Sequence, residues 1–194
     1  MGVSLSKGGN ISLNSAAPGM NKIVIGLGWE ERQTDGKDFD LDASLFMLSQ
    51  AGRVRGDEDF IFYNNMSSSC GSVVHQGDNL TGASDGESDE EEVNVDLAAI
   101  PSEINKVSIA VSIHDAVANH QNFGQVSNAY IRIVNQANNE EITRYDLTED
   151  YSIETAMIFG ELYRHNAEWK FRAVGQGYEG GLEKIMGQFG VDVS

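Results

Sequence analysis

Acidic side chains gather in two separate segments of the chain, DFDLDAS at 38–44 and GDNLTGASDGESDEEE at 77–92. In the first segment Asp38, Asp40 and Asp42 alternate with apolar residues, so an extended strand would place all three carboxylates on one face. Neighbouring carboxylates on that face lie about 7 Å apart, and each such pair repels by about 2.4 kcal/mol at an effective dielectric constant of about 20. Because a divalent cation would turn this repulsion into attraction, the pattern favours a metal site.

Calcium is the cation that suits this set of donors. It takes about six to eight oxygen ligands from carboxylates, amide side chains, backbone carbonyls and water, in a flexible geometry. The second segment offers carboxylates and amides, with glycines that let carbonyl groups turn inward. Zinc or copper would need a cluster of Cys and His, and the single cysteine and four scattered histidines do not form one. From the residues alone, a solvated acidic face, another cation and an acidic docking surface stay open as alternatives.

The acidic segments do not match the EF-hand calcium loop. Counted from Asp38, position 6 is Ala43 where the loop needs Gly, and position 12 is Ser49 where it needs Glu. Counting from Asp85 fails in the same way. A calcium site in this chain therefore belongs to another architecture.

The net charge of −17 is spread unevenly. Residues 30–92 hold 16 acidic and four basic side chains, a local net charge of −12. This density of negative charge repels phosphate backbones and disfavours nucleic-acid binding. The single cysteine, Cys70, fits a reducing compartment, and the chain shows neither a secretory signal nor an apolar run of about 18 residues. We expect a soluble, cytoplasmic protein that does not insert into a membrane.

Short apolar runs rich in Val, Ile, Phe and Tyr recur between turn residues, and most of them alternate apolar with polar residues, as half-buried strands do. They predict one mainly β domain over residues 1–194, an antiparallel β-sandwich with a few short helices and long acidic metal-binding loops. The predicted strands are 21–28, 41–48, 59–63, 91–96, 106–113, 128–134 and 141–147.

The C-terminal part of the chain allows two interpretations. Residues 152–178 fit a helix capped by Ser152, but they fit better a hairpin of two aromatic-rich arms with Asn166 in its turn. GLEKIMGQF at 181–189 predicts a short helix that Gly190 ends. A turn or two of helix is also expected at 115–121.

Isolated features carry weaker signals. His114 beside Asp115 could form half of a catalytic pair, but no serine or cysteine occupies a nucleophile motif, and a polar turn after a strand is the better interpretation. Trp29 and Trp169 lie in apolar runs, and we expect both of them to pack in the core.

Longer strings of this sequence resemble the TerD family of tellurium-resistance and stress-response proteins. They are GWEERQTDGKDFDLDASLFML, FIFYNN and HQGDNLTGASDGESDEEEVNVDL in the first half, and QNFGQVSNAYIRIVNQ, ETAMIFGELYRHNAEWKFRAVGQGY and GGLEKIMGQFGV in the second. The resemblance runs from about residue 3 to about residue 193. It implies a calcium-binding β-sandwich with no established catalytic activity, associated with resistance to tellurite, phage and colicins.

The resemblance also implies a set of metal ligands. By position these are Asp40, Asp42, Asn64, Asn65, Asp78, Asn79, Asp85, Asp89, Glu90 and Glu91. Where the family reads GEGDGDDE, this chain reads GASDGESDEE, a departure that weakens the assignment of Asp85 more than that of Asp89, Glu90 and Glu91.

We expect segments 38–44 and 77–92 to meet at one edge of the sandwich and to bind two calcium ions. Binding would order the second segment and change the surface offered to a partner, such as another, membrane-bound protein of the tellurium-resistance system. An acidic scaffold that needs no metal is one alternative. A metal-assisted hydrolase is another, although no residue stands out as its general base. Thiol chemistry on tellurite is disfavoured, because one cysteine cannot form a dithiol couple.

Overall fold

The computed structural model describes residues 2–31, 39–78, 89–148 and 153–193. The strands are β1 (Val3–Leu5), β2 (Asn10–Ser12), β3 (Lys22–Glu31), β4 (Leu41–Ser49), β5 (Phe60–Ile61), β6 (Val73–Asp78), β7 (Glu91–Asp96), β8 (Ile104–Ile113), β9 (Val126–Asn135), β10 (Glu140–Asp146), β11 (Ala156–His165) and β12 (Glu168–Tyr178). The helices are α1 (Leu13–Ala16) and α2 (Gly181–Phe189), with 3-10 turns η1 (Asp57–Asp59) and η2 (Phe123–Gln125).

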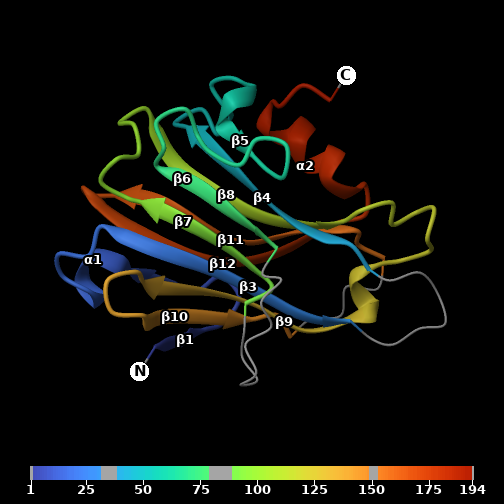
Figure 1. Ribbon diagram of the computed structural model, residues 1–194, viewed down its shortest axis with the longest axis horizontal. Coiled ribbons are helices and arrows are strands. Elements are labelled where there is room, and N and C mark those ends of the chain that lie inside the picture. Colours follow the sequence, from blue (N-terminus) through green and yellow to red (C-terminus); the bar gives the residue numbers. More distant parts are fainter. Residues whose placement is uncertain (1, 32–38, 79–88, 149–152, 194) are drawn as a thin grey trace.

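Within these residues the strands form two six-stranded sheets that pack face to face (Figure 1). The first sheet has the order β1-β10-β9-β3-β7-β6, and the second has the order β2-β12-β11-β8-β4-β5. All neighbouring pairs are antiparallel except β1 and β10, which pair in parallel. The predicted β-sandwich is therefore confirmed, with one parallel pair at the edge of the first sheet.

Period-2 alternation builds the core between the sheets. Along β8, Val107, Ile109 and Val111 point into this core, as predicted. The half-buried pattern predicted for the strands leaves the opposite face toward solvent, yet Ser108 and Ala110 on that face of β8 are also buried. The reason is tertiary: α2 packs over the outside of the second sheet and creates a second apolar cluster there.

Most predicted elements match the structure. The strand at 91–96 and the helix at 181–189 are confirmed at their predicted bounds. The hairpin interpretation of 152–178 is confirmed in place of the helix, because β11 and β12 pair in antiparallel register. Their turn places Asn166 and Ala167 at φ of 50° and 63°, the left-handed conformation that a two-residue hairpin turn of type I′ requires.

Other predictions were wrong in extent or type. The strand at 59–63 shrinks to Phe60–Ile61, because the chain folds back on itself through a Phe62–Asn65 bridge. Residues 115–120 form turns where a helix was expected at 115–121, and Asp115 and His120 have positive φ, outside the range of a right-handed α-helix. The sequence prediction missed the short edge strands β1 and β2, the one-turn helix α1, and β6.

Helix α2 packs on the second sheet through its apolar face. Ile185 and Phe189 are buried against the outer face of the second sheet, where the Phe189 ring lies 5.0 Å from the ring of Phe46. Gly190 ends the helix in the left-handed conformation at φ of 80°, as the sequence predicted. No helix in the described residues is long and apolar enough to cross a membrane.

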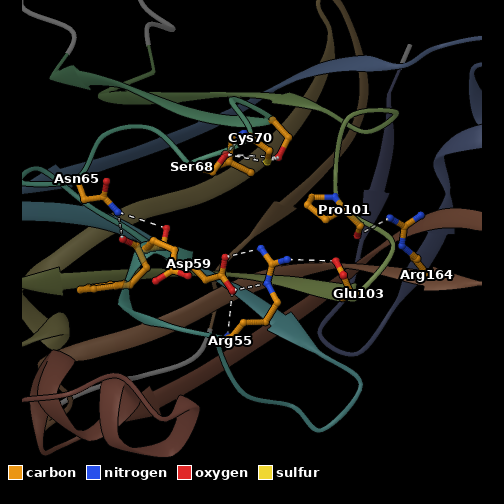
Figure 2. A network of polar contacts seen from close by, with 12 residues as sticks. Arg55, Asp59, Asn65, Ser68, Cys70, Pro101, Glu103 and Arg164 are labelled. Atoms are coloured by element: carbon orange, nitrogen blue, oxygen red, sulfur yellow. Dashed lines mark hydrogen bonds and ion pairs between the residues drawn. The ribbon is translucent and has the colours of Figure 1, made fainter.

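A polar network fixes the loops that follow β4 (Figure 2). The Asp59 carboxylate is buried and accepts hydrogen bonds from Nε and a terminal nitrogen of Arg55 at 2.9 and 2.8 Å. The hydrogen bond to Asp59 raises the pKa of Arg55 above its ordinary value. Arg55 also reaches Glu103 at 3.2 Å, and Arg164 donates to the backbone carbonyls of Ile104 and Ile100. These bonds fix the loops on the second sheet.

A buried hydroxyl gives the first prediction. Ser108 is 1% exposed, and its Oγ has no hydrogen-bond partner among the described residues. Because an unsatisfied buried hydroxyl destabilises a fold, Ser108→Ala should raise the free energy of unfolding by about 1 kcal/mol. Urea unfolding of the parent protein and of the variant measures this change in the free energy of unfolding.

The matched control is Ser68→Ala, which removes a buried hydroxyl that accepts a hydrogen bond from the Val73 backbone N–H at 3.1 Å. The free energy of unfolding of this variant should fall by about 1 kcal/mol. An equal fall in both variants would mean that the Ser108 hydroxyl has a hydrogen-bond partner in solution.

Candidate functional site

A pocket of about 380 Å³ opens where β4 begins. Phe39 and Leu41 pack toward the core between the sheets, so the alternation of the strand turns Asp40 and Asp42 the other way, toward the pocket. The Asp40 carbonyl accepts a hydrogen bond from the His114 backbone N–H at 2.7 Å, which ties this segment to the end of β8. The remaining lining residues are Tyr63, Met66, His75, Gly77 and His114.

The buried carboxylate of Glu91 joins the two acidic segments. Its Oε2 accepts a hydrogen bond from the backbone N–H of Ala43 at 2.8 Å. Strand β5 pairs only with Leu45 and Phe46, so this stretch of β4 has no strand partner on that side among the described residues. The carboxylate takes the place of the missing strand, and the described parts of 38–44 and 77–92 meet here, as predicted.

His75 completes this contact. Its Nε2 lies 3.0 Å from Glu91 Oε2, and its Nδ1 accepts a hydrogen bond from the Gly77 backbone N–H at 2.9 Å. Because Nδ1 is an acceptor, the ring proton is on Nε2, which donates it to the carboxylate. Both ring nitrogens of this buried histidine are therefore engaged, Nδ1 within β6 and Nε2 across to Glu91 of β7.

Asp89 has a different partner. Its carboxylate is 2% exposed and accepts hydrogen bonds from Arg132, from Nε to both oxygens at 2.9 and 3.1 Å and from a terminal nitrogen at 2.8 Å. The Tyr130 hydroxyl donates to the same carboxylate at 2.8 Å. Burial and the hydrogen bond to Asp89 raise the pKa of Tyr130 above its ordinary value. Burial alone would lower the pKa of Arg132, but its hydrogen bonds to Asp89 outweigh burial and raise it.

Two glycines of β3 make room for this cluster. A Cβ atom at Gly26 would collide with the Asp89 carboxylate, and one at Gly28 would collide with the Tyr130 ring. The GLG string at 26–28 thus allows the Tyr130 side chain of β9 and the Asp89 side chain, two residues before β7, to pack closely onto β3. Sequence inspection alone offered no signal for this role.

The other predicted ligands lie as follows. Asn65 donates from Nδ2 to the Phe60 carbonyl at 2.7 Å within its own turn (Figure 2), and Asn64 is exposed beside it. The exposed Glu90 donates its backbone N–H to the Leu27 carbonyl. Asp78 pairs through its backbone with Glu91 at the end of β6. Asp38, Asn79 and Asp85 lie outside the described residues.

The structure therefore sorts the acidic residues by environment. Asp40 and Asp42 line an open pocket, whereas Asp89 and Glu91 are buried and bonded to protein groups. Within the described parts of the chain, no three His, Cys, Asp or Glu side chains lie close enough to hold a metal ion by themselves. The sequence analysis missed His75, Tyr130 and Arg132, because their partners are distant in the chain.

His114 and Asp115 form a polar turn after β8. Their side chains are 52% and 58% exposed, with Nε2 3.4 Å from a carboxylate oxygen. The interpretation of this pair as a turn is confirmed. Trp169 is buried in the core and Trp29 packs partly against it, as expected.

Asp89 gives the second prediction. Asp89→Asn removes the buried counter-charge of the half-buried Arg132, which keeps only the longer contact with Glu141 at 3.5 Å, so the free energy of unfolding should fall by about 2 to 3 kcal/mol. Urea unfolding in the presence of a chelator measures this loss without any contribution from a bound metal.

The control for this variant is Asp146→Asn. The Asp146 side chain is 51% exposed and forms an ion pair with Arg144. Its replacement should lower the free energy of unfolding by less than about 1 kcal/mol. A loss at Asp89 no larger than that of the control would contradict a stabilising role for the buried pair.

The comparisons with known proteins agree with this fold. The TerD domain model matches residues 1–189. The chain is 62% identical to tellurium resistance protein TerD of Serratia marcescens and 57% identical to general stress protein 16U of Bacillus subtilis, over the full length of all three chains. The crystal structure of a TerD homologue from Streptomyces coelicolor superposes with a TM-score of 0.64 at 20% identity, over 86% of this chain and 95% of that one. This chain is therefore a member of the TerD domain family of tellurium-resistance and stress-response proteins.

Proposed function

We propose that this protein binds calcium and acts, without catalysis, as a calcium-dependent interaction module in the stress response associated with tellurite resistance. Two of its relatives are named for tellurium resistance and for general stress. The proposal adds a metal and a mode of action to that family role.

The observation that carries the proposal is the shared orientation of Asp40 and Asp42. Both line one pocket of about 380 Å³, and none of the described residues that line it is Lys or Arg. Two carboxylates on one face, about 7 Å apart along an extended chain, suit a cation that accepts oxygen ligands in flexible geometry.

The donor set fits calcium in part. Asp40 and Asp42 would hold the ion, which would take further oxygens from backbone carbonyls, water and the predicted ligands outside the described residues. Asp89 and Glu91 already bond to Arg132 and to Ala43, so in this proposal they anchor the site. A second ion would depend on predicted ligands such as Asn79 and Asp85, which lie outside the described residues.

Calcium would change the surface around the pocket. A doubly charged ion neutralises the local negative charge, so a partner surface that Asp40 and Asp42 repel in the metal-free protein could then approach. In this proposal the partner is another protein of the tellurium-resistance system, which can be membrane-bound, and the interaction takes place in the cytoplasm.

The geometry favours binding over hydrolysis. A metal-assisted hydrolase needs a general base within reach of a metal-bound water. Both nitrogens of His75 are engaged by Gly77 and Glu91. His114, the other histidine at the pocket, faces Asp115 in an exposed turn. Phosphate esters with calcium, magnesium or manganese should therefore not be hydrolysed.

The test of calcium binding is titration of chelator-treated protein by isothermal calorimetry and thermal melting. Calcium at about 100 times Kd should stabilise the protein by about 2.7 kcal/mol per site. The double variant Asp40→Asn with Asp42→Asn should lose both the heat and the stabilisation, because its amides carry no charge.

The control double variant is Glu140→Gln with Asp146→Asn on β10, which removes two acidic charges from the other sheet and should respond to calcium as the parent does. Absence of heat and stabilisation in the parent protein would refute the proposal. Binding of a partner that weakens with salt but ignores calcium would instead indicate the metal-independent scaffold.

A further inference from the structure

A second and larger hollow lies on the outer face of the second sheet. Its volume is about 770 Å³, and its walls come from α2, from the aromatic residues of β5 and the turn that follows, and from the turn after β8. Figure 1 shows α2 and β5 near β4, the strand that contributes to the floor. The hollow adjoins the pocket at the start of β4, and the two share Asp42, Tyr63 and His114.

Small side chains on the floor explain why the space is open. The outer face of β4 carries Ser44 and then Phe46, and the facing part of β8 carries Ser112. Phe46 fills the space under the last turn of α2, where it contacts Phe189. Under the first turn of α2, the serines leave the space unfilled, and Leu182 forms part of its wall.

The floor carries a polar group without a partner. Ser44 is 1% exposed, lines the hollow, and its Oγ makes no hydrogen bond to any described residue. A buried hydroxyl in this state is unfavourable unless another molecule supplies a donor or an acceptor. The position of Ser44 at the hollow indicates where that molecule would lie.

Charge defines the chemistry of the occupant. Four carboxylates line the hollow, those of Asp42, Asp115, Glu179 and Glu183, and none of the described lining residues is Lys or Arg. The remaining walls are mostly apolar. A volume of this size lies within the range of small-molecule sites, which combine apolar walls with a few polar groups.

We propose that this hollow binds a small organic ammonium ion with an apolar body. The aromatic and aliphatic walls, including Phe60, Phe62 and Met186, contact the body of the ligand. The cationic head lies among the carboxylates at the rim, and a polar group of the ligand satisfies the Ser44 hydroxyl. Of the four carboxylates, only Asp42 also lines the proposed calcium pocket, so the other three can hold the cationic head whether or not calcium binds.

Three probes with the same phenyl body but different head groups test the proposal. They are phenethylamine, which is cationic, 2-phenylethanol, which is neutral, and 3-phenylpropionate, which is anionic. Amide NMR spectra of the full chain report both affinity and location. Phenethylamine should bind with a Kd on the order of 1 mM and shift the amides of residues 112–118 and 179–186. The neutral and anionic probes should bind at least about fivefold more weakly, because they lack the attraction to the rim.

Variants of the rim sharpen the test. Asp115→Asn with Glu183→Gln should weaken phenethylamine binding about fivefold, and Asn tolerates the positive φ of position 115. The control Glu140→Gln with Asp146→Asn removes the same charge from the other sheet and should leave Kd unchanged. Ala118→Trp places a bulky ring at an exposed lining position and should block binding of the amine.

Several results would overturn the proposal. They are equal affinity for the three probes, amide shifts confined to other parts of the molecule, or an unchanged Kd in the rim variant. Binding at the same amides of a basic, aromatic hexapeptide but not of phenethylamine would overturn it in favour of a protein segment as occupant.

Discussion

Burial of the carboxylates of Asp89, two residues before β7, and of Glu91, its first residue, is the constraint on which this site depends. A buried carboxylate is tolerated only when hydrogen bonds or opposite charges replace its water. Asp89 meets this condition with Arg132 and Tyr130 of β9, and Glu91 meets it with His75 of β6 and the backbone of β4. Because these partners come from both sheets, the two carboxylates fix β7 within the first sheet and hold it against the second. The position of the acidic pocket follows from them.

Acidic residues thus have two different environments around the start of β4. Asp89 and Glu91 are buried and hydrogen-bonded to distant protein groups, whereas Asp40 and Asp42 line an open pocket. The buried carboxylates hold the backbone in place around the two that line the pocket. Calcium, in the function proposed above, would add attraction to a scaffold that folds on its own internal pairs.

Small residues create the space that the larger ones use. Gly26 and Gly28 let the Asp89 carboxylate and the Tyr130 ring lie directly on β3. Ser44 and Ser112 leave a hollow beside α2, close to the acidic pocket. Two adjoining hollows of negative character therefore lie near the start of β4, and Asp42 lines both. Occupancy of one site would alter the electrostatic field in the other.

The sequence by itself determined the elements whose pattern is local. Alternation fixed β3, β4, β7, β8, β9 and β10, helical spacing fixed α2, and Asn166 marked the hairpin turn, because each pattern reflects one face of one element. It also placed Asp40 and Asp42 on a common face. Only the tertiary structure decided which carboxylates are buried anchors, because Asp89 lies 43 residues from Arg132 and Glu91 lies 48 from Ala43. The tertiary structure also determined where the short edge strands β1 and β2 form, because pairing with neighbouring strands stabilises them. A carboxylate has the same chemistry in every sequence position, and its role is set by the groups that folding brings to it.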